Sequence, residues 1–242
     1  MRAGMLFRSL LIQGAWNYGT MLGPGFALTL LPVLRRVHAE DPAALASSIE
    51  RHAEHFNAHP YLASVALGAV ARMESDGADN ETVRRFKTAL RGPLGGLGDT
   101  LVWATWLPLV AVGALVLYWF GVPGWVATLT FVVVYNVGHL GLRAWGLRLG
   151  LEAGRDVGTR LTEADLGGWA RRLQHLLVLG LGVLSGTILG APDGLGSFGP
   201  VVAGLAVVGF VAGLVGGHRA WRPAAAVMVV VIALIGAWGI LS

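Results

Sequence analysis

The sequence predicts an all-α integral membrane protein, with about five transmembrane helices, N-terminal re-entrant helical hairpins and a cytoplasm-facing helical region. Of its 242 residues, 55% are hydrophobic and only 13% are charged, about half the charged share of a typical soluble domain. Asp99 is the only charge in the range 92–142, and Asp193 is the only one in 173–218. Uncharged apolar runs of about 20 residues are long enough to cross a bilayer. We expect an N-terminal re-entrant and cytoplasm-facing region over residues 1–91, followed by a multi-span membrane region over residues 92–242.

The first element, the uncharged stretch Ser9–Leu34, is predicted to form a re-entrant hairpin of two half-length helices. Arg8 precedes this stretch and Arg35 follows it, so a single crossing would leave one basic end outside. Gly23-Pro24-Gly25 in its middle favours a break in the helix. An amphipathic surface segment is the alternative. A hairpin would need a packed partner or a pathway, because irregular backbone at membrane depth must be buried or line a cavity.

Three helices of a more soluble type are expected next. Asp41-Pro42 is typical of a helix start, and the apolar stripe that follows should end before Pro60. A second helix is expected over Tyr61–Glu74. A third, Glu81–Arg91, carries basic side chains opposite an apolar face. Such a helix is compatible with binding to an anionic lipid surface, and equally with a charged face exposed to water.

Five membrane spans are expected after these helices. In an alternating arrangement all 18 basic residues fall on one side of the membrane. The positive-inside rule assigns that side to the cytoplasm, so the N-terminal region should face the cytoplasm and the C-terminus should lie outside. The predicted spans are Leu101–Phe120, Trp125–Trp145, Leu173–Gly190, Pro200–Gly216 and Pro223–Leu241.

The histidines His52, His55 and His59 raise the question of a metal site. His55 and His59 have the i,i+4 spacing of a zinc-binding helix face, but the residue after His55 is Phe56, which does not fit the HExxH pattern. Pro60 also disfavours helical geometry at His59. We therefore predict no metal site, and a membrane metalloenzyme is the weakest functional hypothesis.

A polar stripe runs along the second predicted span. Tyr135, His139 and Arg143 repeat every four residues, and Asn136 lies beside them. Polar groups inside a membrane are costly and usually face a bundle interior or a pathway. Hydrogen bonding between helices and a transport pathway are both compatible with this stripe.

Asp99 follows the glycine-rich sequence Gly92–Gly98, which we interpret as a turn before the first span. The carboxylate is suited to cap a helix that begins at Thr100 and to interact with the positive end of its dipole. Alternatively, it is suited to accept hydrogen bonds from sugar hydroxyls, with the glycines bringing the backbone close to a ligand. The sequence leaves both roles open.

Signatures of catalysis are missing from the sequence. It has no cysteine, no GxxxxGK[ST] loop, no GxSxG elbow and no carboxylate pair at a useful spacing. We therefore predict no catalytic residue and no cofactor. The pI near 10.1 reflects basic cytoplasmic segments, and it does not indicate a nucleic-acid partner.

Four blocks of the sequence, in order, resemble the IID component of mannose/fructose/sorbose-family sugar phosphotransferase systems. The resemblance extends over nearly the whole chain, and its second and third blocks are the most specific. The blocks are Gln13–Tyr18 with Gly25-Phe26 and Leu31-Pro32, then Arg51-His52 with Phe56–Ala63, then Gly92–Asp99 with Trp103 and Leu107-Pro108, and finally Tyr135–His139 with Arg143 and Gly150–Gly154.

The resemblance implies a bacterial inner-membrane subunit without chemistry of its own. In such systems, phosphate passes through histidines of the cytoplasmic IIA and IIB phosphocarrier proteins to an incoming sugar, and IIC and IID form the membrane complex. The implied partners are a IIC subunit, IIA and IIB, a hexose-class sugar and the lipid bilayer, in a hetero-oligomer. Candidates for the substrate path or the subunit contact are polar residues in these blocks, namely Asn17, Asn57, His59, Asp99, Asn136 and His139.

Two departures from the family pattern keep other functions open. Gly19-Thr20 stands where relatives usually have Glu-Arg, and the connection 191–199 is short. A regulatory remnant of a phosphotransferase complex would fit such losses. A stand-alone channel or secondary carrier is the alternative from another class.

Overall fold

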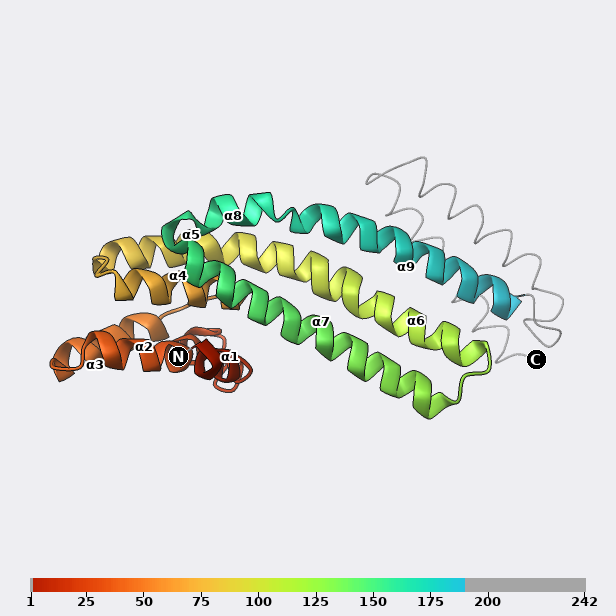
Figure 1. The fold of residues 1–242 in the computed structure, drawn as a ribbon, viewed down its shortest axis with the longest axis horizontal. Coiled ribbons are helices and arrows are strands. Elements are labelled where there is room, and N and C mark those ends of the chain that lie inside the picture. The colour runs from red at the N-terminus through yellow and green to blue at the C-terminus, as the bar shows by residue number, and fades with distance from the viewer. Residues whose placement is uncertain (1, 190–242) are drawn as a thin grey trace. The chain divides into compact units, whose positions relative to one another are not determined.

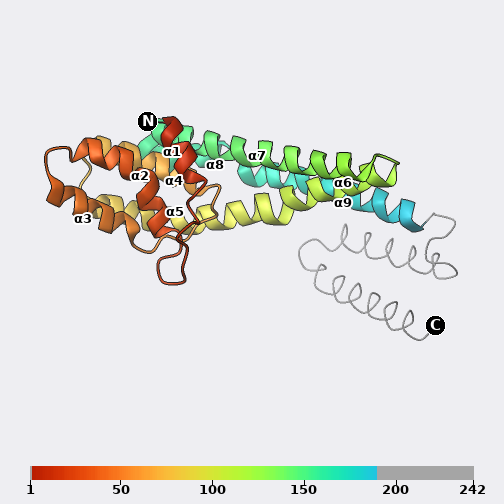
Figure 2. The ribbon, with the colours of Figure 1, turned by 90° about the horizontal axis from the view of Figure 1, so that it is seen from below.

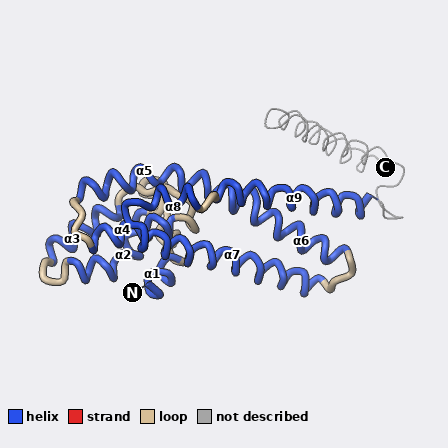
Figure 3. The backbone as a smooth tube through the Cα atoms, turned by 45° about the horizontal axis from the view of Figure 1, so that its top comes forward, coloured by secondary structure: helices blue, strands red, loops and turns tan. Residues whose placement is uncertain are grey.

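The computed structural model describes residues 2–189, and the predicted spans Pro200–Gly216 and Pro223–Leu241 lie outside this range. The chain divides into two compact units, Met1–Val178 and Leu179–Ser242. The described residues are helical, with no strand beyond isolated bridges that join Met21 to Asn17 and Phe56 (Figures 1 and 3). The all-α prediction is therefore confirmed for this part of the chain.

The N-terminal segment folds back without forming the predicted pair of half-length helices. Helix α1 (Arg2–Ser9) is followed by turns, and helix α2 (Gly23–Val37) begins at the Gly-Pro-Gly sequence. Gly23-Pro24-Gly25 marks the start of a helix and does not separate two helices: turns precede it, and Pro24 occupies the first turn of α2, where its missing N–H breaks no helical hydrogen bond. A Cβ on Gly25 would overlap the backbone of Ile12, so the two arms approach closely at this glycine.

Helices α3 (Pro42–Ala53) and α4 (Ala63–Ser75) confirm two of the predicted elements. The Asp41 side chain accepts a hydrogen bond from the Ala44 N–H at 2.9 Å, as expected of an N-cap. However, α3 ends at Ala53 and not at Pro60. Phe56 therefore lies beyond the helix and packs, fully buried, against Phe26 with ring centroids 4.6 Å apart.

The glycine-rich sequence does not form the predicted turn. Helix α5 (Asn80–Gly98) contains it entirely, and a π-helix, η1 (Asp99–Trp106), and helix α6 (Leu107–Trp119) continue without a break. The predicted boundary between residues 91 and 92 therefore lies inside a helix.

The chain then reverses at Gly121, whose φ is +88°, and returns as helix α7 (Gly124–Ala153). A 3-10 turn, η2 (Gly154–Asp156), and helix α8 (Val157–Glu163) lead to helix α9 (Leu166–Leu189). By length and composition, two helical stretches among the described residues are able to cross a membrane, Asn80–Trp119 and Gly124–Thr187.

The core of the first unit lies around α4. Helices α2, α5 and α7 all pack against α4, and α6 and α7 form an antiparallel hairpin (Figure 2). Residues Ala63–Ala71 of α4 are all buried. Small residues bring α4 and α7 together, since Cβ atoms on Gly68 and Gly150 would each meet the other helix's backbone.

Candidate functional site

Polar and aromatic side chains converge where the loop before α4, the π-helix η1 and α7 meet. We call this group the aromatic cluster. It brings together two predicted site residues from distant parts of the chain, His59 and His139. Its members are His59, Tyr61, Trp103, Tyr135, His139 and Arg143.

Tyr61 lies at the centre of the aromatic cluster. Its hydroxyl is 2.8 Å from the hydroxyl of Tyr135, and its ring stacks on His139 with centroids 4.1 Å apart. The Arg143 guanidinium lies over the same ring, 4.9 Å from its centroid, and its Nε donates to His139 Nε2 at 2.9 Å. Arg143 also donates to the carbonyl of Ser9. The polar stripe of α7 therefore forms hydrogen bonds to other segments of the chain. Such bonding was one of the two roles predicted for it.

His59 is buried beside the π-helix, with an exposed fraction of 2%. Its Nδ1 accepts the Tyr61 N–H at 3.2 Å, and its ring lies 5.1 Å from that of Trp103. Burial, with a smaller effect of the positive charge of Arg143, lowers the pKa of His59 to about 4. His59 is therefore neutral at pH 7. A Cβ on Gly98 would overlap its ring, so this glycine makes the position of His59 possible.

The π-helix shapes this meeting point. The Leu107 N–H bonds to the carbonyl of Val102 five residues earlier, and Thr105 Oγ1 donates to the carbonyl of Thr100 at 2.7 Å. From α9, Gln174 donates to Thr105 Oγ1 at 3.3 Å. Such i→i+5 turns are rare and frequently occur at functional sites. No feature of the sequence predicted one here.

Asp99 is the first residue of the π-helix and does not cap it. Its φ of −61° and ψ of −43° are helical, and its N–H bonds to carbonyls of α5. The predicted N-cap role is therefore wrong, because a cap residue must leave the helix. The Asp99 side chain is exposed, which keeps contact with a ligand or a partner as its remaining predicted role.

The three predicted asparagines are all exposed, and their contacts are local. Asn17 Oδ1 accepts the N–H groups of Gly19 and Thr20, and Asn17 Nδ2 donates to Thr20 Oγ1 at 2.7 Å. Asn17 thus holds the turn that contains the departure from the family pattern. Asn136 donates to the carbonyl of Val132 at 2.8 Å. Asn57 lies on the surface between two buried residues.

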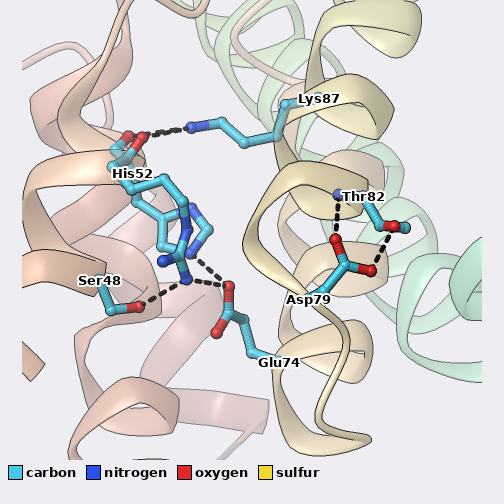
Figure 4. A network of polar contacts seen from close by, with 7 residues as sticks. Ser48, His52, Glu74, Asp79, Thr82 and Lys87 are labelled. Carbon is cyan, nitrogen blue, oxygen red and sulfur yellow. Dashed lines mark hydrogen bonds and ion pairs between the residues drawn. The ribbon is translucent and has the colours of Figure 1, made fainter. Parts of the chain in front are cut away.

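A second group, the buried ion network, joins α3, α4 and α5 (Figure 4). Sequence reasoning did not find it. Glu74 Oε1 accepts from Arg51 Nη2 at 2.7 Å and from His52 Nε2 at 2.9 Å. Arg51 also donates to Ser48 at 3.0 Å. Arg51, His52 and Glu74 are each at least 90% buried, so these bonds compensate for the loss of water.

Lys87 completes the network from α5. Its Nζ donates to the carbonyls of Arg51 and His52 at 3.1 and 3.4 Å, near the C-terminal end of α3, where a positive charge is favourable. It also lies over the ring of Phe26. Because Lys87 is only 5% exposed, it does not belong to the predicted basic surface of this helix. Its spacing could have shown this, since Val83, Lys87, Leu90 and Leu94 are all buried on one face.

The ionisation of this network follows from its burial and its bonds. Burial lowers the pKa of His52, and the hydrogen bond to Glu74 opposes this effect only in part. Burial alone would raise the pKa of Glu74, but hydrogen bonds from His52 and Arg51 outweigh it and lower that pKa. At pH 7 the network therefore contains a neutral His52 and an ionised Glu74.

The three clustered histidines contact three different parts of the chain. His52 bonds to Glu74, His55 is 3.4 Å from Arg91, and His59 packs on the π-helix. Within residues 2–189, no group of three or more His, Cys, Asp or Glu side chains could hold a metal ion.

Most polar groups of the aromatic cluster bind other members of that cluster, and the same is true within the buried ion network. Both groups therefore position helices. The exposed Asn57, Asp99 and Asn136 remain open to a ligand or partner.

Comparison with known proteins identifies relatives of this chain. Residues 1–190 match the family model described as PTS system mannose/fructose/sorbose family IID component. The mannose-specific EIID component of Escherichia coli K12 is 33% identical over 160 residues, 64% of this chain. The fructose permease IID component of Bacillus subtilis 168 is 28% identical over 194 residues. The aligned part covers only 56% of the first relative and 66% of the second.

Solved structures share the fold. One, titled as the structure of a membrane protein, superposes with a TM-score of 0.67 at 29% identity, over 76% of this chain and 68% of that one. A chain of the mannose transporter ManYZ, determined by cryo-electron microscopy in complex with microcin E492, gives a TM-score of 0.60 at 24% identity. That alignment covers 96% of this chain and 94% of the other, and it supports the fold alone.

Proposed function

The chain belongs to the PTS mannose/fructose/sorbose family of IID components, and from this premise we propose that it forms a sugar-translocation unit with a IIC subunit. The observation that carries the proposal is the family match over residues 1–190, which contains every residue of both clusters. Two helical stretches that are long and apolar enough to cross a membrane support it. The transported substrate would be a hexose-class sugar.

In this proposal the chain carries no phosphoryl group and catalyses no step. Cytoplasmic IIA and IIB proteins would supply phosphate to the sugar, and IIC would hold most of the sugar. The asymmetric distribution of basic residues in the sequence supports an N-terminal region facing the cytoplasm and a C-terminus outside.

The exposed polar residues are the proposed contacts with IIC or with the substrate path. Asp99 and Asn136 are exposed on helices long enough to cross the membrane, where an exposed polar side chain is costly in lipid. A partner subunit or a water-filled path would remove that cost. His139 is half-buried beside Asn136 and contributes through the aromatic cluster.

Co-expression with the matching IIC subunit tests this function. We expect the two chains to co-purify from detergent, and cells that also contain IIA and IIB to take up labelled mannose, fructose or sorbose. Failure to co-purify would exclude the complex. A complex without uptake would favour a regulatory remnant. Sugar exchange by this chain alone in liposomes would favour a stand-alone carrier.

The substitution Asp99→Asn tests the contact residues. It removes one exposed charge and nearly preserves shape, so we expect weaker co-purification or slower uptake with an unchanged unfolding temperature. Glu40→Gln is the matched control, because it neutralises an exposed carboxylate outside the family blocks. If Asp99→Asn leaves both uptake and complex formation unchanged, Asp99 is not a contact residue.

A further inference from the structure

We propose that a groove in the first unit, between α7 and the first turns of α9, binds one phospholipid with an anionic headgroup. Two adjoining cavities form the groove, and both include Gly138 and Leu142 of α7. The inner cavity, of about 190 Å³, is lined mainly by apolar side chains, among them Leu101, Val102 and Leu173. The outer cavity, of about 480 Å³, has Trp145 and Trp169 in its lining.

The groove crosses the level at which hydrocarbon gives way to headgroups. The stretch of α7 from Gly124 to Leu142 is uncharged and rises about 28 Å at 1.5 Å per residue, close to the roughly 30 Å of a hydrocarbon core. Arg143 is the first charge after it. Gly138 therefore lies within the hydrocarbon, and Trp145 lies beyond Arg143 at the interfacial level that tryptophan prefers. An acyl chain fits the inner cavity, and a headgroup fits the outer one.

The charge at the outer end is complementary to an anionic headgroup. The Arg172 guanidinium lies over the ring of Trp169, 5.0 Å from its centroid, and Arg172 is exposed. It makes no ion pair with any residue in the range 2–189. No carboxylate lines either cavity. Basic side chains at this level of a membrane protein attract anionic lipids.

The groove also has room for an occupant. A Cβ added to Gly141 would meet no atom within 4 Å, although Gly141 lines the outer cavity. Gly138 is different, because a Cβ there would meet the Trp106 ring that forms a wall of the inner cavity. Substitution of Gly141 by a large residue should therefore fill the groove without disturbing the packing around it.

Native mass spectrometry of the delipidated full chain in detergent tests the proposal. We expect palmitoyl-oleoyl phosphatidylglycerol to bind as one tight equivalent, on the order of fivefold more tightly than the phosphatidylcholine with the same chains. Equal binding of the two lipids by the unmodified chain would overturn the proposal.

Two variants with matched controls locate the site. Gly141→Leu should reduce phosphatidylglycerol binding severalfold, whereas Gly113→Leu should not, because Gly113 also has open space but lies on α6 away from the groove. Arg172→Gln should remove the preference for phosphatidylglycerol, and Arg155→Gln, at another exposed position, should keep it. Binding by Gly141→Leu equal to that of the unmodified chain would overturn the proposal.

A photoreactive amino acid at position 141, in cell membranes that contain the IIC subunit, distinguishes a lipid from a protein occupant. Crosslinks to phospholipid would support the proposal. Crosslinks to a peptide, either from residues 190–242 of this chain or from IIC, would show that protein fills the groove and would overturn it.

Discussion

Three glycines of α5 and two glycines of α7 have opposite surroundings. Gly92, Gly95 and Gly96 of α5 have nothing within 4 Å of a built Cβ. On α7, a Cβ at Gly146 would meet Ser64 and Val65 of α4, and one at Gly150 would meet backbone of α4. The first set therefore leaves a helix surface bare, and the second joins two helices.

This difference shows that glycine in a helix can either leave a surface without side chains or allow close contact with another helix. In water, each glycine inside a helix costs about 1 kcal/mol relative to alanine, so a run of them favours a turn. In a membrane, small residues let helices approach closely, and backbone hydrogen bonding preserves the helix. Gly98 ends the bare set and is the exception, because it contacts His59.

The largest effect is expected where α4 meets α7. Gly150→Leu places a side chain against the backbone of Val65, Gly68 and Ala69, which must separate the two helices. We expect a loss of at least about 3 kcal/mol in the free energy of unfolding. Tryptophan fluorescence during denaturation in detergent measures it. Gly141→Ala, in open space on the same helix, is the control, and comparable losses in the two variants would refute this account of the contact.

A smaller effect is expected at Gly98. Gly98→Ala forces the loop that carries His59 away from α5, and we expect a loss of about 2 kcal/mol in the free energy of unfolding. Gly96→Ala serves as its control, since Gly96 has open space two residues earlier. If the two variants unfold alike, His59 does not depend on Gly98.

Acid should destabilise the protein through the same histidine. The folded-state pKa of His59 is about 4, below its ordinary value near 6.5, so the unfolded chain binds a proton first as the pH falls. Stability is therefore complete above about pH 6.5 and declines toward pH 4, by roughly 1–2 kcal/mol at pH 4.5. The lowered pKa of His52 acts in the same direction.

The measurement is the unfolding midpoint between pH 7 and pH 4.5. His59→Gln keeps an acceptor for the Tyr61 N–H but does not titrate in this range, so its midpoint should fall less with acid. A parallel decline in both proteins would assign the effect to other groups.

The smallest change in the free energy of unfolding is expected on the bare surface of α5, and there it should be an increase. Gly95→Ala should stabilise the protein by about 0.5–1 kcal/mol, because alanine lowers the entropy of the unfolded chain and meets no neighbour. Denaturation measures the gain. A stabilised variant that no longer co-purifies with IIC would show that a partner needs this surface free of side chains. A destabilised variant would contradict the finding that an added Cβ at Gly95 meets no neighbour.

The sequence predicted much of the helical architecture because its signals were local. The Asp41-Pro42 start of α3 and the α4 helix were predicted, as was the polar stripe of α7. The membrane character followed from the uncharged runs alone. The predicted glycine-rich turn before Asp99 was wrong, because α5, η1 and α6 continue through it without a break, and local glycine propensity does not reveal that continuity.

The candidate site was predicted only in part, since its contacts join residues far apart in the chain. His59 and His139, named separately as candidates from the sequence, lie together in the aromatic cluster, and their functional roles stay predictions; Tyr61, which joins them, was not named. The buried ion network and the π-helix depend on tertiary packing. The roles of Asn17, Asn57, Asp99 and Asn136 remain predictions.

The bond from Arg143 to the carbonyl of Ser9 ties the N-terminal segment to α7, and this would make the segment sensitive to the thickness of the surrounding bilayer. An arginine at a membrane boundary normally adapts to a change of thickness by extending its side chain toward water. Arg143 is 2% exposed and held by Ser9, His139 and the Tyr61 ring, so it lacks that freedom. A thicker bilayer would instead tilt α7 or pull on the end of α1, and the hydrophobic mismatch would act on the segment that leads to α2.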